Sequence, residues 1–239
     1  MNLPLSQRFP MELIPVIDLM QGLVVHAKGG QRDQYQPLKS PLSLDASPER
    51  VIEGLLTLAP FKTVYIADLD ALMGHQPQWR RLNQLTDAFP EILFWLDVAG
   101  LDVPRRGVMG PLRVVGSESL ALCFEERLLP WPQESILSLD FMGAHFKGPP
   151  GLLVSDRCWP CRVILMNLAR VGRGDGPHLA QLECFRADFP GHDYFVAGGV
   201  RHEADLLDLK VAGAKGVLLA SALHDARIDP LSLSRIMTA

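Results

Sequence analysis

The stretch IPVIDL, residues 14–19, returns in altered form as ILSLDF, residues 136–141. Both are nearly continuous apolar runs, as expected of strands buried on two faces, and both carry an aspartate next to their last residue. Three further pairs of similar segments follow in the same order: VYIADL (64–69) with VILMNL (163–168), VAG (98–100) with VAG (196–198), and Gly116-Ser117 with Ala220-Ser221. The shared order predicts a chain built from two similar halves.

Short apolar segments alternate with longer segments of helical periodicity, which is typical of a parallel sheet. Eight core strands are expected, at Leu13–Asp18, Thr63–Asp68, Ile92–Asp97, Leu112–Gly116, Ser135–Asp140, Arg162–Asn167, Tyr194–Ala197 and Gly216–Ala220. Helices are expected from Ser47-Pro48 onward and over Gln78–Ala88 and His178–Ala187, whereas 101–111 and 141–160 leave little room for one. This pattern favours a closed (β/α)8 TIM barrel, an α/β fold. We expect one domain over residues 1–239, with half-barrels at 12–125 and 134–239.

Composition narrows the class of function. The formal net charge is −4 and no cluster of Lys and Arg occurs, which argues against a nucleic-acid partner. No apolar run is long enough to span a bilayer, and the first residues do not resemble a secretory signal. We therefore expect a cytoplasmic protein that is a monomer or a homodimer.

The four cysteines, Cys123, Cys158, Cys161 and Cys184, are too few for a secreted disulfide scaffold. Cys158 and Cys161 have the CxxC spacing of a redox or zinc half-site. However, the chain has no second such pair, and the motif leads into a strand rather than a helix. We expect buried structural cysteines, with no metal and no cofactor.

Asp18 and Asp140 each lie at the end of an apolar strand, so both are expected at the carboxyl-terminal mouth of the barrel. Because they hold equivalent places in the two halves, they should face one another across the opening. Two carboxylates in a partly desolvated mouth can be tuned apart in pKa, which leaves one as base and one as acid. The pair therefore predicts proton transfer on a small substrate. The alternative is that each only caps the following turn or pairs with a nearby cation.

Phosphate binding is the second prediction. TIM barrels commonly hold phosphate with the loops after strands seven and eight. The residues assigned to such a site are Gly198, Gly199, Ala220 and Ser221, together with Gly176 from the loop after strand six. The expected ligand is a small phosphorylated metabolite.

Two further loops contribute candidate residues. The long loop after strand one, residues 28–35, is interpreted as a lid in which Arg32 binds an anionic group and Lys28 is the candidate for a Schiff base. For Lys28 a solvated surface loop is the alternative. Asn167 and Arg173, at and after strand six, are candidates for substrate binding.

These landmarks resemble the ProFAR isomerase (HisA) and HisF-like histidine-biosynthesis barrels over nearly the whole chain. The matching motifs are IPVIDL with Gly22 and Val24-Val25, ADLDA (67–71), Leu139-Asp140, Gly172 with Gly176-Pro177, and AGGV (197–200). In the isomerase, the aspartates that match Asp18 and Asp140 act as general base and general acid in an Amadori rearrangement of an aminoaldose to an aminoketose. Its substrate carries two phosphates, one held by each half.

This chain departs from the isomerase pattern at three places. VAGL (98–101) stands for Gly-Gly-Gly-Ile-Arg, Met166-Asn167 for Thr-Asp, and Ala220-Ser221-Ala222 for Gly-Arg/Lys-Ala. The stretches KGGQRDQY (28–35) and LARVG (168–172) resemble a divergent HisA-related subfamily of archaea and methylotrophs, in some cases encoded near genes of methanopterin- or methanofuran-linked one-carbon metabolism.

Three hypotheses stay open. The first is an isomerase, or a related acid/base enzyme, acting on a small phosphorylated substrate. The second is an enzyme of one-carbon cofactor biosynthesis that forms an imine through Lys28. The third is a barrel that binds phosphorylated metabolites without catalysing a reaction.

Overall fold

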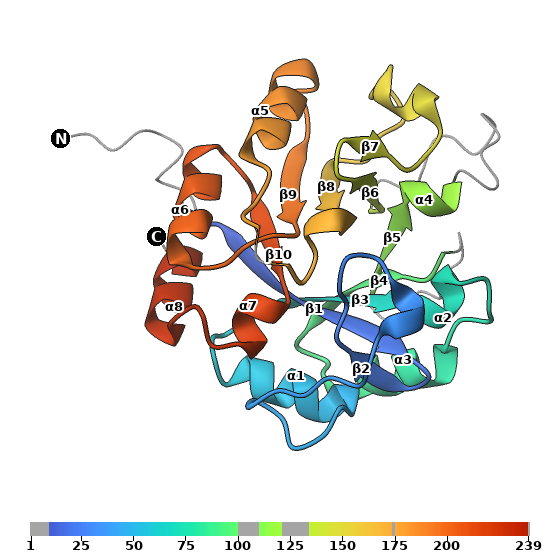
Figure 1. Ribbon diagram of the computed structural model, residues 1–239, viewed down its shortest axis with the longest axis vertical. Coiled ribbons are helices and arrows are strands. Elements are labelled where there is room, and N and C mark those ends of the chain that lie inside the picture. The colour runs from blue at the N-terminus through green and yellow to red at the C-terminus, as the bar shows by residue number, and fades with distance from the viewer. Residues whose placement is uncertain (1–9, 100–109, 121–133, 174, 239) are drawn as a thin grey trace.

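The computed structural model describes residues 10–99, 110–120, 134–173 and 175–238. Eight parallel strands form a ring that closes between the last strand and the first (Figure 1). In chain order they are β1 (Glu12–Met20), β3 (Thr63–Asp68), β4 (Leu93–Asp97), β5 (Leu112–Gly116), β6 (Ile136–Met142), β8 (Arg162–Asn167), β9 (Asp193–Ala197) and β10 (Gly216–Leu219). All eight expected strands are present, and the predicted (β/α)8 TIM barrel is confirmed.

Two short strands extend the ring at equivalent places. β2 (Leu23–Val25) runs antiparallel to the end of β1, and β7 (His145–Phe146) runs antiparallel to the end of β6. The first strand of each half therefore continues into a hairpin beyond the barrel.

Helices surround the ring (Figure 1). They are α1 (Pro48–Leu56), α2 (Leu69–Leu72), α3 (Trp79–Ala88), α4 (Ser117–Leu120), α5 (Leu179–Asp188), α6 (Glu203–Val211), α7 (Ser221–His224) and α8 (Pro230–Thr238), with 3-10 turns η2 (Arg32–Gln34), η4 (Pro150–Leu153) and η5 (Leu168–Arg170). The three expected helices are confirmed as α1, α3 and α5, and the helical structure within 141–160, all of which is described, is limited to the turn η4. Most of 101–111 lies outside the described residues. No helix in the described part of the chain is long and apolar enough to cross a membrane.

Ser47 precedes α1 as expected but does not cap it. Its hydroxyl donates instead to Asp45 Oδ1 at 2.6 Å. In contrast, Asp68 caps α2, because its carboxylate accepts from the backbone N–H of Ala71 at 3.2 Å, and it also accepts from that of Gln78 at 2.6 Å. Asp68 is thus held in a structural role at the end of β3.

The twofold repeat is visible in the register of the strands. Corresponding residues of the two halves pair with corresponding residues on the neighbouring strands. The aligned pairs are Asp18–Ala67 and Asp140–Met166, Ala67–Asp97 and Met166–Ala197, Asp97–Val114 and Ala197–Leu218, and Leu137–Val115 and Pro15–Leu219. In a ring of eight strands, equivalent strands lie on opposite sides. Asp18 on β1 and Asp140 on β6 therefore stand across the barrel mouth from each other.

The alignment expected for the third strand of each half is wrong by two residues. The identical letters pair Ala99 with Ala197, but the register aligns Asp97 with Ala197 and hence Ala99 with Gly199. Ala99 accordingly has a left-handed backbone, with φ of +57°, where Gly199 has +91°. The neighbouring Gly100 and Leu101 lie outside the described residues.

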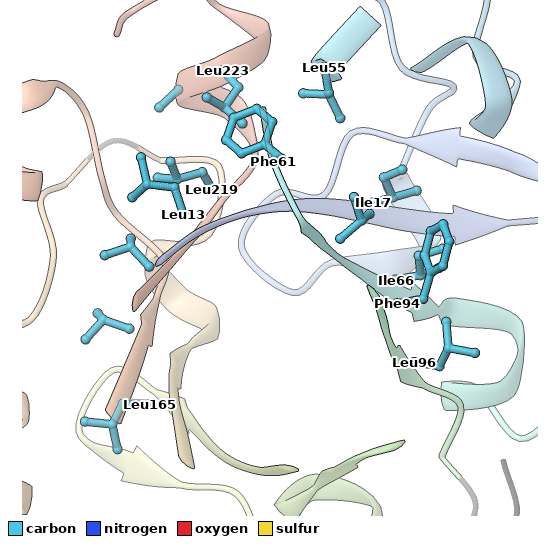
Figure 2. Packing of buried hydrophobic residues seen from close by; sticks show 14 of the residues in the cluster. Leu13, Ile17, Leu55, Phe61, Ile66, Phe94, Leu96, Leu165, Leu219 and Leu223 are labelled. Carbon is cyan, nitrogen blue, oxygen red and sulfur yellow. The ribbon is translucent and has the colours of Figure 1, made fainter. Parts of the chain in front are cut away.

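The core has two layers, because alternate strand residues point to opposite sides of the ring. The outer layer packs strands against helices and includes Leu13, Ile17 and Phe61 (Figure 2). The inner layer fills the ring, where Trp95 and Phe195 meet edge to face with centroids 4.9 Å apart. These two aromatic residues are themselves equivalent in the repeat, two positions before Asp97 and Ala197. The packed interior supports the mouth from below.

The expectation of buried structural cysteines is wrong for Cys161, which is exposed, while Cys158 is half-buried and both are free thiols. The segment before β8 runs along the surface, so the second cysteine of the motif faces solvent. Its Sγ lies 3.8 Å from Asp193 Oδ2. Cys184 is also exposed, and Cys123 lies outside the described residues.

Candidate active site

A cavity of about 530 Å³ opens at the carboxyl-terminal end of the barrel strands. This is the end at which TIM barrels carry their active sites, and the volume suits a small metabolite. Every barrel strand, or the turn after it, contributes to the wall, with Asp18, Ala67, Asp97, Glu118, Asp140, Met166, Ala197 and Leu218 as examples. Asp18 and Asp140 therefore share one cavity, as expected from the repeat.

Asp18 carries a carboxylate without a hydrogen-bonding partner among the described residues. It points inward from β1, in step with the inner-layer residues Ile14 and Val16, and lines the cavity. Burial raises the pKa of Asp18 from 3.8 to about 7, and the positive charge of Arg32 opposes this rise. A carboxylate that no protein donor holds is free to accept a proton from a ligand.

Asp140 is held firmly in place. Ser138 Oγ donates to its Oδ1 at 2.6 Å and the Glu118 N–H donates to its Oδ2 at 3.1 Å, while its own N–H donates to Ser117 Oγ at 2.8 Å. Burial raises the pKa of Asp140 to about 7, the bond from Ser138 opposes the rise, and the negative charges of Glu118 and Asp97 add to it. Like charges around Asp140 favour its protonated form, whereas Arg32 favours the ionised form of Asp18.

Asp97 is a third buried carboxylate in the wall, and sequence reasoning missed it. It ends β4 and accepts from the Tyr65 hydroxyl at 3.0 Å. Burial raises the pKa of Asp97 to about 6, against the hydrogen bond from Tyr65. Its place at the end of a barrel strand is the same signal that identified Asp18 and Asp140. The misaligned VAG segments hid it.

Arg32, predicted to bind an anionic group, lines the cavity but already has a partner. From η2 it forms an ion pair with Glu118 on α4, so the loop after β1 reaches the turn after β5. Glu118 also lines the cavity and was not predicted. No local pattern identifies it, because its closeness to Arg32 depends on closure of the ring.

The residues assigned to phosphate binding line the cavity. They are Gly198 and Gly199 after β9, which we call the glycine loop, and Ala220 and Ser221 after β10. Gly199 is packed so closely that a Cβ there would lie 2.1 Å from the Gly176 carbonyl oxygen. The Gly176 N–H donates to the Gly199 oxygen at 3.0 Å, and Arg170 Nη1 donates to the Gly176 oxygen at 2.7 Å. Gly176 thus lies behind Gly199 as its support rather than among the described residues of the wall.

Three other predicted residues also lie outside the wall formed by the described residues. Lys28 and Arg173 are exposed, and the guanidinium of Arg173 lies beside Gly29. Asn167 is buried and its amide donates to the Gly143 oxygen at 3.3 Å. The wall instead takes its basic side chains from Arg32, Lys147, Arg170 and Arg227.

In the part of the chain that the structure describes, no group of three or more His, Cys, Asp and Glu side chains is arranged to hold a metal ion. The chemistry that the wall itself offers is proton transfer, from buried carboxyl groups with pKa values of about 6 to 7.

Comparisons with known proteins agree with this architecture. The model of a family described as histidine biosynthesis protein matches residues 159–229. An uncharacterised protein of Methanocaldococcus jannaschii is 28% identical over 229 residues, covering 92% of this chain and 96% of that protein. Two proteins named as phosphoribosylated imidazole-4-carboxamide isomerases are also similar. That of Pyrococcus furiosus is 22% identical, covering 91% of this chain and 90% of its own length, and that of Lacticaseibacillus casei is 24% identical, covering 95% and 99%.

Proposed function

We propose, on the premise that this chain is a divergent relative of the histidine-biosynthesis barrels, that it is an acid/base isomerase of a small phosphorylated substrate. The reaction is of the Amadori type, which converts an aldose derivative to a ketose derivative. The observation that carries the proposal is the pair Asp18 and Asp140, two strand-end carboxyl groups on opposite sides of one cavity, each with its pKa raised to about 7.

Asp140 is the general acid in this proposal and Asp18 the general base. Asp140, protonated among like charges, gives its proton to the ring oxygen as the sugar ring opens. Asp18, ionised beside Arg32, removes the proton from C2, which gives the enol. A proton then returns from Asp18 to C1 while the C2 hydroxyl gives its proton back to Asp140, which leaves the C2 ketone and restores both carboxyl groups. Protons and electrons balance without an oxidant. A carboxyl group with a pKa near the working pH is suited to either role.

The phosphate lies, in the same proposal, against Gly198, Gly199, Ala220 and Ser221. Glycine lets the backbone approach an anion closely, and the left-handed backbone of Gly198 and Gly199 is open to few other residues. Gly176 and Arg170 support this loop from behind. Lys147 lines the cavity and Lys28 does not, so the alternative of a Schiff base on Lys28 gains no support from this arrangement.

The test is proton exchange at C2. Phosphorylated aldoses and aminoaldoses are incubated with the protein in D₂O, and loss of the C2 proton is followed by NMR. We expect exchange with at least one of these substrates, and Asp18→Asn should slow it by about 10² to 10⁴-fold while ligand affinity stays nearly unchanged. Asp208→Asn, which removes one exposed carboxylate on α6, is the matched control and should behave as the native chain.

A barrel that only binds metabolites predicts a different result. In that case the native chain binds the phosphorylated ligand but shows no exchange above the rate without protein. The same outcome, with the protein folded, would reject the isomerase.

A further inference from the structure

The two ends of the cavity offer a substrate different surroundings. The turn Gly116-Ser117 after β5 and the turn Ala220-Ser221 after β10 are equivalent in the repeat and lie on opposite sides of the ring. In the second half this region is formed by glycines and small side chains. In the first half the corresponding backbone already has a partner inside the protein, since the Glu118 N–H donates to Asp140 Oδ2 at 3.1 Å. A phosphate at that turn would have to displace a carboxylate.

A second carboxylate stands at the same place. Asp97 occupies the inward position that Ala197 holds in the other half. A Cβ on Gly116 would lie 3.2 Å from Asp140 Oδ2 and 3.5 Å from Asp97 Oδ2, so both carboxyl groups border the turn. Both side chains are buried, at 5% and 6% exposure. Asp97 in its ionised form, buried at this distance from the turn, would repel an incoming anion strongly.

Glu118 adds a third carboxylate to this side of the wall. Arg32 is paired with Glu118 and so compensates its charge, whereas Asp97 has no paired cation among the described residues. Lys147 is the other basic residue close to Asp140. Its side chain is exposed, and its backbone N–H donates to the carbonyl oxygen of Asp140. Counted over the described residues alone, the first-half end of the cavity thus has more acidic groups than paired cations.

The backbone of the first half also lacks the openness of the glycine loop. Val98 and Ala99 stand at the positions of Gly198 and Gly199. Val98 packs in the outer core layer, and Ala99 carries a Cβ where Gly199 has none.

We infer that the substrate carries a single phosphate, directed at the second half, and a protonated amine at its other end, received by Asp97 and Glu118. The phosphate end of this inference rests on the proposed function. An ammonium group supplies three donors and a positive charge, so its hydrogen bonds to two carboxylates are charge-assisted. A second phosphate at this end would meet the same carboxylates with repulsion.

The test measures binding and needs no turnover. Calorimetry compares three probes at each of several chain lengths: an n-alkyl phosphate, the ω-aminoalkyl phosphate and the α,ω-alkane bisphosphate. At the best length we expect the amino compound to bind at least about tenfold more tightly than the alkyl phosphate, as one charge-assisted bond would give. The bisphosphate should bind more weakly than the alkyl phosphate.

Variants locate the effect. Glu118→Gln and Asp97→Asn should each remove most of the preference for the amine, and Glu118→Gln should also improve binding of the bisphosphate because it frees Arg32. Asp208→Asn, with the same loss of charge far from the wall, should change neither. Thermal unfolding verifies that each variant is folded.

The outcomes separate this inference from the proposed function. If the bisphosphate binds most tightly, or the amine preference is absent or persists in both variants, the inference is overturned while the isomerase proposal stands. If no phosphorylated probe binds at any length, the phosphate site is wrong and the inference fails with it.

Discussion

The side of the barrel mouth at β9 and β10 presents small residues and backbone, and the side at β4 and β5 presents carboxylates, although both halves of the chain share one hydrogen-bond register. Gly199 and Ala197 correspond to Ala99 and Asp97. The family model matches 159–229, entirely within the second half. Register is set by the whole sheet and its buried core, so it resists change. Side chains at the mouth bear little of the packing, which lets one half diverge while the scaffold stays fixed.

The largest expected effect concerns growth. If the chain catalysed ProFAR isomerisation, both halves would have to hold a phosphate, and expression would rescue a histidine auxotroph lacking that isomerase. We expect no rescue, because carboxylates occupy the first-half turn. Immunoblotting and solubility controls show that the protein is present. Growth without histidine would contradict the claim that the first-half turn does not hold a phosphate.

Gly199→Ala should be the most damaging single substitution in the glycine loop. The new Cβ would lie 2.1 Å from the Gly176 oxygen, and the backbone φ of +91° is strained for any L side chain. We expect a loss of about 3 kcal/mol or more in the free energy of unfolding, measured by urea denaturation. A loss below about 1 kcal/mol would mean that this loop is not rigid.

Asp18→Asn should stabilise the protein at alkaline pH. The folded-state pKa of Asp18 is about 7 against 3.8 for the unconstrained group, so the folded chain holds this proton more tightly than the unfolded chain. Stability from this residue is therefore greatest below pH 4 and is lost as the pH rises to about 7. We expect a gain of about 2–4 kcal/mol at pH near 8 and a smaller gain at pH near 5.

Asp140→Asn tests whether the hydrogen bonds of Asp140 make its contribution to stability differ from that of Asp18. Its carboxylate accepts bonds from Ser138 and from the Glu118 N–H, and an amide replaces only part of them. The gain at alkaline pH should therefore be smaller than for Asp18→Asn. Equal gains in the two variants, from denaturation curves at several pH values, would show that the hydrogen bonds do not distinguish the two sites.

Ala99→Gly, the first-half counterpart of Gly199, should have the smallest effect. Glycine relieves the left-handed strain at φ of +57° but increases the entropy of the unfolded chain. We expect a change within about 1 kcal/mol, toward greater stability. A loss as large as that of Gly199→Ala would contradict the alignment of the two halves.

Much of this architecture could be predicted from the sequence because it depends on periodicity and repetition. The apolar strands and the order of the paired segments were sufficient to predict the barrel and to place Asp18 and Asp140 at its mouth. The third strand was misaligned because the identical letters VAG outweighed the strand end at Asp97. Glu118 could not be predicted, because its contact with Arg32 joins segments that only ring closure brings together.

The predicted loop residues that lie outside the described wall share a physical cause. A position in a loop after a strand does not determine which way a side chain points. Lys28 and Arg173 are exposed, and Gly176 lies behind the wall. Strand residues were predicted more reliably because the alternation along a strand fixes which of them face the interior.

The division between the halves can be measured directly by anomalous diffraction from crystals soaked in tungstate, an analogue of phosphate. One strong peak beside Gly199 and Ser221, with none beside Ser117, is the expected result. A peak at the first-half turn, at both turns, or at neither would contradict a barrel that binds phosphate with its second half alone.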